Sequence, residues 1–309
     1  MQRLTLARGV PDSLKGSIVA LGNFDGFHLG HQAVASRAVA RAFHERRPVI
    51  AATFDPHPVK FFRPGVPPFR LTTLDQREAL FAHAGADAML VFEFGAELAS
   101  MDAEAFVADV LGKRIGAAGV VTGDDFSFGK GRTGDAALLA KVGREHGIGA
   151  EAVAQVVLDG ERISSGRIRE ALMAGDTATA THMLTRDYAI EGVVLRGDRR
   201  GRELGYPTAN LDLGDYLRPK YGIYAVRVTL EDGTEHPGVA SLGVRPTFEP
   251  PQELLEAHLF GFEGDLYGRK IEVALHAFIR EERKFDSVEA LVAEMRKDEA
   301  QARRLLAID

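Results

Sequence analysis

The sequence contains neither cysteine nor tryptophan. Without a thiol the chain can form no disulfide, thiolate nucleophile or thiolate zinc site. Histidines, carboxylates, hydroxyls and backbone amides must therefore carry any chemistry. A chain without structural disulfides is typical of the reducing cytoplasm, and a cytoplasmic protein is what we expect.

Long apolar runs and an excess of basic charge are also missing. No window approaches the roughly 18 uninterrupted apolar residues of a membrane span, and the first residues lack the apolar core of a signal peptide. The 38 Lys and Arg are outnumbered by 44 Asp and Glu, and the resulting net charge of −6 argues against a general nucleic-acid binder. We expect neither a membrane nor a nucleic acid as a partner.

The first part of the chain alternates short β-branched apolar runs with longer segments of helical periodicity. The runs are residues 17–21, 48–54, 88–94, 117–123 and 150–157, and the helical segments are 31–47, 74–84, 102–115, 134–147 and 167–174. This alternation predicts an α/β doubly wound parallel sheet. Ligands of such sheets bind beyond the carboxyl ends of the strands.

The second part reads as strands separated by Gly and Pro turns. The predicted strands are residues 188–197, 222–230, 236–243, 253–260 and 271–279, followed by a charged helix over 287–307. The pattern predicts an antiparallel β-barrel domain with a C-terminal helix. We therefore expect two domains, 1–185 and 186–309.

The segment GNFDGFHLGH (22–31) joins the first predicted strand to the first predicted helix. Gly22 and Gly26 permit a tight turn, and the helix start offers N–H groups and a positive dipole end to an anion. His28 and His31 could donate hydrogen bonds to phosphoryl oxygens there. Two alternatives remain. The histidines could only cap the helix, or they could bind a metal, although no nearby Glu completes an H-E-x-x-H pattern.

Three further segments fit a nucleotide site beside this loop. FDPHP (54–58) follows the second strand, GDDFSFG (123–129) follows the fourth, and ISSGRIRE (163–170) offers hydroxyls and an Arg able to bind phosphate with two bonds. The alternative for the two Phe of GDDFSFG is core packing. The alternative for ISSGRIRE is an N-cap and the exposed first turn of a helix.

GDRRGRELGYPTANL (197–211) follows the first strand of the second domain. Its glycines permit an arch around nucleotide phosphates, and its arginines are available as cationic partners. Thr208 and Asn210 are two residues apart, so in an extended segment their oxygens lie on one side and suit Mg²⁺. The alternative is a turn with local hydrogen bonds.

Glu256 and His258 share one face of a predicted strand. If that face points inward, Glu256 could act as a general base in the mouth of the barrel. If it points outward, the two side chains form a solvated pair. The spacing leaves both interpretations open.

Residues 16–184 resemble the HxGH nucleotidyltransferases, in the form seen in bacterial FAD synthetases. The resemblance implies ATP binding by Gly22, Phe24, Asp25, Gly26, His28, His31, Ser164, Ser165 and Arg169. It implies a flavin site with His57, Asp125, Phe126 and Phe128. Gly166 departs from the family motif ISSTxIR, in which a Thr supplies one more hydroxyl.

Residues 187–286 resemble riboflavin kinases through PTAN, YGIYAV (221–226), SLGVRPTF (241–248), EAHLF (256–260) and DLYG (265–268). The resemblance implies ATP binding by Gly197, Arg202, Gly205, Pro207, Thr208 and Asn210, with Mg²⁺ on Thr208 and Asn210. It also implies that Glu256 takes the proton from the 5′-hydroxyl of riboflavin. Arg245 and Gly261 stand where the family commonly has Asn and Asp.

Together the two halves resemble the prokaryotic bifunctional riboflavin kinase/FAD synthetase family. The resemblance implies that ATP phosphorylates riboflavin to FMN, and that a second ATP adenylylates FMN to FAD with release of pyrophosphate; His28, His31 and Glu256 are the implied catalytic residues. Two other functions stay open: nucleotidyl transfer to another phosphorylated acceptor, and a flavin carrier or sensor without turnover. The sequence also leaves open weak self-association, transfer of FMN between sites and the preferred redox state of the flavin.

Overall fold

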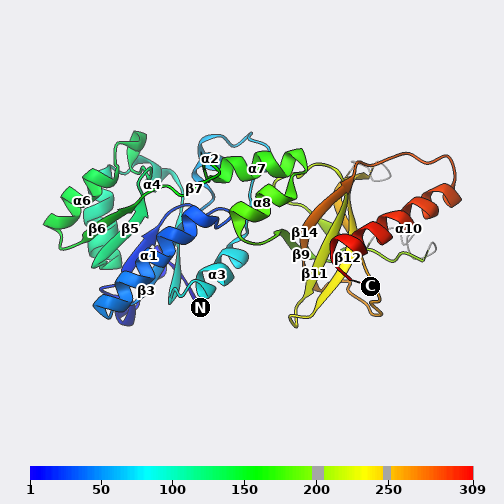
Figure 1. Cartoon of the computed structure of the whole chain (residues 1–309). Coiled ribbons are helices and arrows are strands. Elements are labelled where there is room, and N and C mark those ends of the chain that lie inside the picture. Colours follow the sequence, from blue (N-terminus) through cyan, green and yellow to red (C-terminus); the bar gives the residue numbers. More distant parts are fainter. Residues whose placement is uncertain (197–204, 246–251, 309) are drawn as a thin grey trace. The chain divides into compact units, whose positions relative to one another are not determined.

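The computed structural model describes residues 1–196, 205–245 and 252–308, and the chain divides into two compact units (Figure 1). The first unit comprises Met1–Pro67 and Thr72–Ser164, and the second comprises Pro68–Leu71 and Ser165–Asp309. The predicted fold class is confirmed, because a parallel α/β sheet is followed by an antiparallel barrel and a C-terminal helix.

Six strands build the sheet of the first unit. They are β1 (Gln2–Thr5), β2 (Ile18–Leu21), β3 (Val49–Asp55), β4 (Ala88–Glu93), β5 (Gly119–Gly123) and β6 (Gly149–Val153). Their order in the sheet is β1-β4-β3-β2-β5-β6, and every neighbouring pair is parallel. Five of them coincide with predicted runs. β1 was not predicted, because it is a short edge strand with only Leu4 buried and so shows no apolar run.

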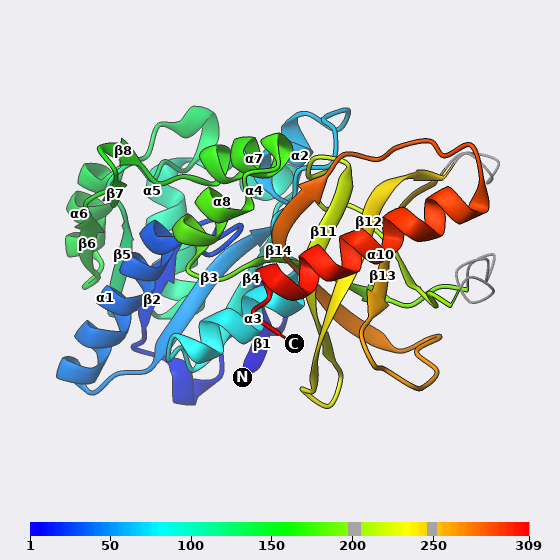
Figure 2. The same ribbon diagram turned by 45° about the vertical axis from the view of Figure 1, so that its right-hand side comes forward.

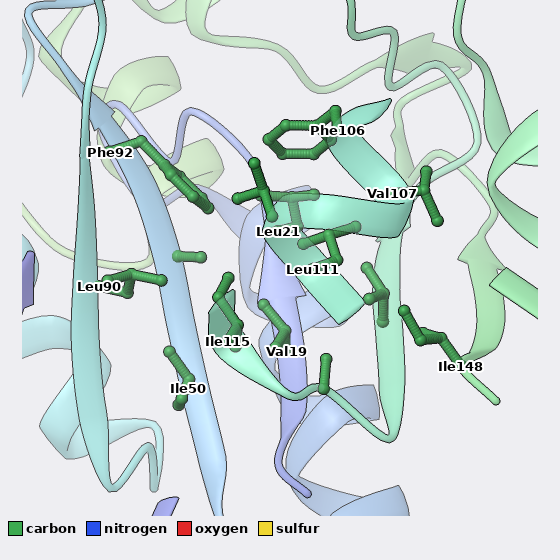
Figure 3. Close-up of a cluster of buried hydrophobic side chains, with 14 of the residues drawn as sticks. Val19, Leu21, Ile50, Leu90, Phe92, Phe106, Val107, Leu111, Ile115 and Ile148 are labelled. Carbon is green, nitrogen blue, oxygen red and sulfur yellow. The ribbon is translucent and has the colours of Figure 1, made fainter. Parts of the chain in front are cut away.

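Helices cover both faces of this sheet. On one face Val19 and Leu21 of β2 share an apolar cluster with the π-helical segment Phe106–Ile115 (Figure 3). On the other face Ile18 of β2 packs with Ala38 of α1 (Leu29–Glu45). Since successive strand residues point to opposite faces, each strand contributes to both layers, as a doubly wound sheet requires.

The remaining elements of the first unit are short. They are the helices α2 (Pro58–Phe62), α3 (Leu74–His83), α4 (Ala96–Ser100), α5 (Ala103–Ala105) and α6 (Ala136–Glu145), the hairpin β7 (Val157–Leu158) and β8 (Glu161–Arg162), and the 3-10 turns Leu6–Arg8, Asp12–Leu14 and Lys130–Arg132. The helix predicted over 102–115 is the α5 turn followed by the π-helical segment.

The order of the strands creates a switch point between β2 and β5. The chain runs from β2 through β3 and β4 on one side, and then returns to place β5 on the other side of β2. Ligands of doubly wound sheets bind outside the carboxyl ends of the strands at such a point. GNFDGFHLGH follows β2 and GDDFSFG follows β5, so both motifs lie where the topology favours a ligand.

Six antiparallel strands build the barrel of the second unit. They are β9 (Tyr188–Val193), β10 (Ala209–Asp212), β11 (Gly222–Leu230), β12 (Glu235–Arg245), β13 (Gln252–Leu259) and β14 (Lys270–Arg280). Their order is β10-β13-β12-β11-β14-β9, and a bridge between Leu195 and Asn210 joins the two ends. The barrel is therefore nearly closed. Five strands were predicted; β10 was expected only as an extended segment.

The described residues of this unit form the helices α7 (Ser165–Ala174), α8 (Thr177–Leu184) and α10 (Val288–Leu305). α10 packs across β11, β12 and β14, where Ala225, Phe260, Ala302 and Leu306 form an apolar cluster (Figure 2). α7 and α8 group with the barrel by their contacts. The boundary after residue 185 stays a prediction. Across the part of the chain that the structure describes, no helix has the length and apolar character that a membrane span requires.

Candidate active sites

The loop after β2 has an unusual backbone. Phe24, Gly26 and Phe27 have φ angles of 50°, 87° and 44°, in the left-handed region that favours glycine. A non-glycine residue held there costs about 1–3 kcal/mol. Phe24 and Phe27 are almost completely buried and meet the ring of Phe81 edge to face. Burying a Phe side chain contributes about 1.5–3 kcal/mol, so the packing of these rings offsets the strain.

Polar contacts hold the same loop from behind. The Asp25 carboxylate, 2% exposed, accepts a hydrogen bond from the N–H of Thr72 at 3.0 Å. In return the N–H of Gly26 donates to Thr72 Oγ1 at 3.0 Å. Asp25 therefore has a clear role in shaping the loop. That it also contacts ATP stays a prediction.

His28 and His31 lie together at the start of α1. His28 is the N-cap residue, and its Nδ1 accepts a hydrogen bond from the His31 N–H at 3.4 Å. The two imidazoles stack with their centroids 3.6 Å apart. Because Nδ1 of His28 is an acceptor, the proton of the neutral ring belongs on Nε2, which is then a donor. The capping contact of the alternative is thus observed, and the role of His28 toward phosphate stays a prediction.

Two glycines of the motif make room for neighbouring rings. A Cβ atom on Gly22 would lie 3.1 Å from the ring of Phe24, and one on Gly30 would lie 3.2 Å from the ring of His28. A larger residue at either position would therefore press on the neighbouring ring, which would have to shift by a few tenths of an ångström. The structure gives Gly22 a packing reason, and its contact with ATP stays a prediction.

The predicted flavin residues follow β3 and β5, the neighbours of β2. His57 caps α2, since its Nδ1 accepts from the N–H of Val59 at 3.2 Å. Phe126 stacks on Phe128, and Phe128 also packs against the core residue Phe106. Phe128 is buried, so the alternative of core packing is observed for this residue. Asp125 is exposed and Phe126 half-buried, and flavin contacts of these residues stay predictions.

The ISSGRIRE motif divides between the two units. Ser164 ends the first unit, while Ser165 and Arg169 belong to α7 in the second. Arg169 donates from Nε to the carbonyl of Phe69 at 2.8 Å, and its guanidinium lies over the Phe69 ring. Arg169 thus anchors the segment Pro68–Leu71, and its role toward phosphate stays a prediction.

Thr208 and Asn210 meet as their spacing predicts. Thr208 Oγ1 and Asn210 Oδ1 are 3.5 Å apart, and Asn210 is 6% exposed. β10 holds Asn210 between two neighbours, because its carbonyl accepts from the N–H of Leu195 at 2.8 Å and its other edge pairs with β13. The local hydrogen bond of the turn alternative is present, and it brings two hard oxygens together.

Glu256 lies directly opposite Asn210 across the β10–β13 pair, and opposite Ser241 across the β12–β13 pair. Residues paired in this way share a face, so these side chains form one polar row. The buried Leu255 and Ala257 occupy the other face, which is the interior of the barrel. The interpretation of Glu256 as inward is therefore wrong: it points outward. It is half-buried rather than fully solvated.

His258 contacts the segment before Thr208, which its position in the sequence did not suggest. Its Nδ1 lies 2.8 Å from the carbonyl of Pro207, and its ring meets Tyr206 edge to face. Tyr206 in turn donates from its hydroxyl to Glu299 of α10 at 3.2 Å. These contacts connect the segment before Thr208 to β13 and to the C-terminal helix. No local pattern could reveal them, because the partners are far apart in the chain.

Some residues predicted for the kinase site lie outside the described residues, and others lie close to the gap at 197–204. Gly197 and Arg202 lie outside the described residues. Gly205 and Pro207 are exposed, and Gly205 has a φ of 82°. Within the described ranges no three His, Asp or Glu side chains gather as a metal site. A cation at Thr208 and Asn210 would thus use two neutral oxygens, which fits Mg²⁺ that keeps its other positions for water and phosphate.

A glycine loop with two imidazoles lies at the switch point of a doubly wound sheet, and a Thr-Asn-Glu group lies on a barrel. Both features suit a transferase of phosphate-containing groups. Comparison with known families agrees: residues 10–167 match the FAD synthetase model and residues 184–306 match the riboflavin kinase model. The chain belongs to the family of bifunctional riboflavin kinase/FMN adenylyltransferases. The resemblance inferred from the motifs is confirmed.

Two relatives illustrate the match. The bifunctional riboflavin kinase/FMN adenylyltransferase of Pseudomonas fluorescens is 41% identical over 294 residues, which cover 95% of this chain and 94% of the relative. That of Escherichia coli K12 is 37% identical with the same coverage. A crystal structure described as a macrolide-efflux protein from Streptococcus pneumoniae is similar with a TM-score of 0.87 and 30% identity, covering 98% of this chain and 99% of that one.

Proposed function

We propose that the chain makes FAD from riboflavin in two ATP-dependent steps. The barrel unit phosphorylates riboflavin to FMN, and the parallel-sheet unit adenylylates FMN to FAD. The observation that carries the proposal is the presence of two separate polar groups in one chain, each in the half that matches the corresponding family.

The kinase step needs a base, because the 5′-hydroxyl of riboflavin is neutral. Glu256, which lies opposite Asn210 in the same polar row, is the carboxylate that we propose for this role. The hydroxyl oxygen forms a bond to the γ-phosphorus, the bond from that phosphorus to the β–γ bridging oxygen of ATP breaks, and the proton passes to Glu256. Mg²⁺ held by Thr208 and Asn210 would neutralise charge on the phosphates.

The adenylyl step needs no base, because the phosphate of FMN is already ionised. One of its oxygens attacks the α-phosphorus of ATP, and pyrophosphate leaves. The protein must place the two anions together and neutralise the charge that develops. The N-terminus of α1 and the imidazoles of His28 and His31 supply donors for this purpose.

One assay tests both steps. The chain is incubated with riboflavin, ATP and Mg²⁺, and separately with FMN, ATP and Mg²⁺, and the flavins are separated by chromatography. FMN and FAD are expected in the first reaction, and FAD with pyrophosphate in the second. Pyrophosphate release only with another acceptor, or with CTP in place of ATP, would favour a different nucleotidyltransferase. Flavin binding without turnover would favour a carrier.

Further properties remain proposals. ATP and riboflavin as substrates would suit a cytoplasmic protein, and fractionation of cells producing the chain checks that location. Weak self-association, proposed on the sequence alone, is checked by sedimentation over a range of concentrations.

A further inference from the structure

Arg77 is a buried cation behind the loop of the adenylylation site. It lies in the first turn of α3 and is 1% exposed. Two features of this position destabilise a guanidinium. Burial removes its hydration, and the positive end of the helix dipole repels it. Because this position lowers the stability that a guanidinium can contribute, we looked for a role of Arg77 other than stability in the contacts that it makes.

The hydrogen bonds of Arg77 converge on the backbone of the loop. Its Nη1 donates to Thr53 Oγ1 at 2.9 Å and to the carbonyl of Asn23 at 3.3 Å. The Thr53 hydroxyl itself donates to the same Asn23 carbonyl at 2.8 Å. Two donors therefore hold one carbonyl, immediately before Phe24 enters the left-handed region.

Arg77 also reaches the other side of the loop. Its Nη2 donates to the carbonyl of Thr72 at 3.3 Å, and Thr72 is the residue that bonds Asp25 and Gly26. One turn further along α3, Phe81 packs on the rings of Phe24 and Phe27. The buried face of one helix thus holds the loop by both polar and aromatic contacts.

The contact continues from the loop to the imidazoles. The Phe24 ring meets His31 edge to face with centroids 5.3 Å apart, and His31 stacks on His28. A shift of the Asn23 carbonyl would move Phe24 and, with it, the pair of histidines. Misplacing catalytic groups by about 1 Å can lower a rate about 100-fold.

We infer that Arg77 is a positioning residue for FMN adenylylation. It touches no reacting atom, and it acts by fixing the backbone of residues 23–26 and, through Phe24, the location of His31. This inference rests on the proposed function of the same loop.

The test compares Arg77→Met and Arg77→Lys in the full chain. For Arg77→Met we expect kcat for FAD formation to fall about 10- to 100-fold, with a smaller change in KM for ATP. Riboflavin phosphorylation by the same preparation should be unchanged. Arg77→Lys should recover most of the rate. The bonds to the Asn23 carbonyl and to Thr53 Oγ1 both come from the single nitrogen Nη1, which an ammonium can replace.

Arg3→Met is the matched control. Arg3 pairs with Asp75 and Glu78 of the same helix on its exposed side and makes no bond to the loop, so FAD formation should stay at the parent rate. Thr53→Val removes the second donor to the Asn23 carbonyl, and a fall in kcat is expected from this variant even if Arg77→Met does not fold.

Three outcomes would overturn the inference. They are a parent-like kcat in Arg77→Met or in Thr53→Val, a Lys variant as poor as the Met variant, and a loss of FAD formation that follows the fraction of unfolded protein. If the unmodified chain makes no FAD, the proposed function fails instead.

Discussion

Replacing His28 by Asn separates its role as the N-cap of α1 from its proposed role as a hydrogen-bond donor to phosphate. The structure shows His28 as the N-cap of α1, with a hydrogen bond of 3.4 Å that is long for such a contact. An N-cap contributes about 0.5–2 kcal/mol, and a bond this long belongs at the lower end. Asn is among the best capping residues, so His28→Asn keeps the cap and removes the imidazole, whereas His28→Ala removes both.

The Ala and Asn variants should differ in stability but lose the same catalytic rate. His28→Ala should lose about 0.5 kcal/mol, or about 1–2 °C in the melting temperature of the first unit, and His28→Asn should lose nothing. Both should lose a donor to a charged phosphate. Such a bond contributes about 1.5–3 kcal/mol, and each 1.36 kcal/mol is about tenfold in rate, so FAD formation should fall about 10- to 150-fold in each.

The assay measures kcat/KM for FAD formation from FMN and ATP, with riboflavin phosphorylation as the internal control and melting followed by circular dichroism. His44→Asn, the same substitution at an exposed position in the last turn of α1, should change neither rate. If His28→Asn makes FAD at the parent rate while His28→Ala does not, the imidazole serves only as a cap, and the phosphate role of the histidine pair is refuted.

Three further predictions concern the barrel. Glu256→Gln should lower the kinase rate about 10²–10⁴-fold and leave FAD formation from FMN intact; equal loss of both activities would remove Glu256 from the role of base. Asn210→Leu should raise the Mg²⁺ concentration needed for half-maximal kinase rate, and an unchanged Mg²⁺ titration would move the cation elsewhere. Burial opposes ionisation of Glu253, but hydrogen bonds from Tyr221 and Arg218 outweigh it and lower its pKa from the ordinary 4.5. Its contribution to stability is therefore present above pH 4.5 and lost as the pH falls through the lowered pKa. In Glu253→Gln the melting temperature of the barrel should depend less on pH in that acidic range. If the melting temperature of the variant changes with pH as in the parent, the assignment is contradicted.

Much of the fold could be predicted because it depends on local patterns. The period of apolar residues distinguishes the parallel-sheet half from the barrel half, and a strand followed by GNFDGFHLGH places a glycine turn and two histidines at a helix start. The spacing of Thr208 and Asn210 predicts that their oxygens meet, and they do. β1 and β10 escaped prediction as strands because neither shows an uninterrupted apolar run or a sustained alternation, whereas the equally short β2 is apolar throughout.

By itself the sequence determined the two fold classes, the location of GNFDGFHLGH, FDPHP and GDDFSFG at the ends of strands, and the family, because these follow from periodicity and from residues close together in the chain. Only the tertiary structure decided which side chains meet. Glu256 faces outward beside Asn210 because the register of β10 on β13 places them opposite each other. Arg77 reaches the Asn23 carbonyl across 54 residues because α3 packs behind the loop. Register and packing depend on how the whole chain closes, and no local pattern encodes them.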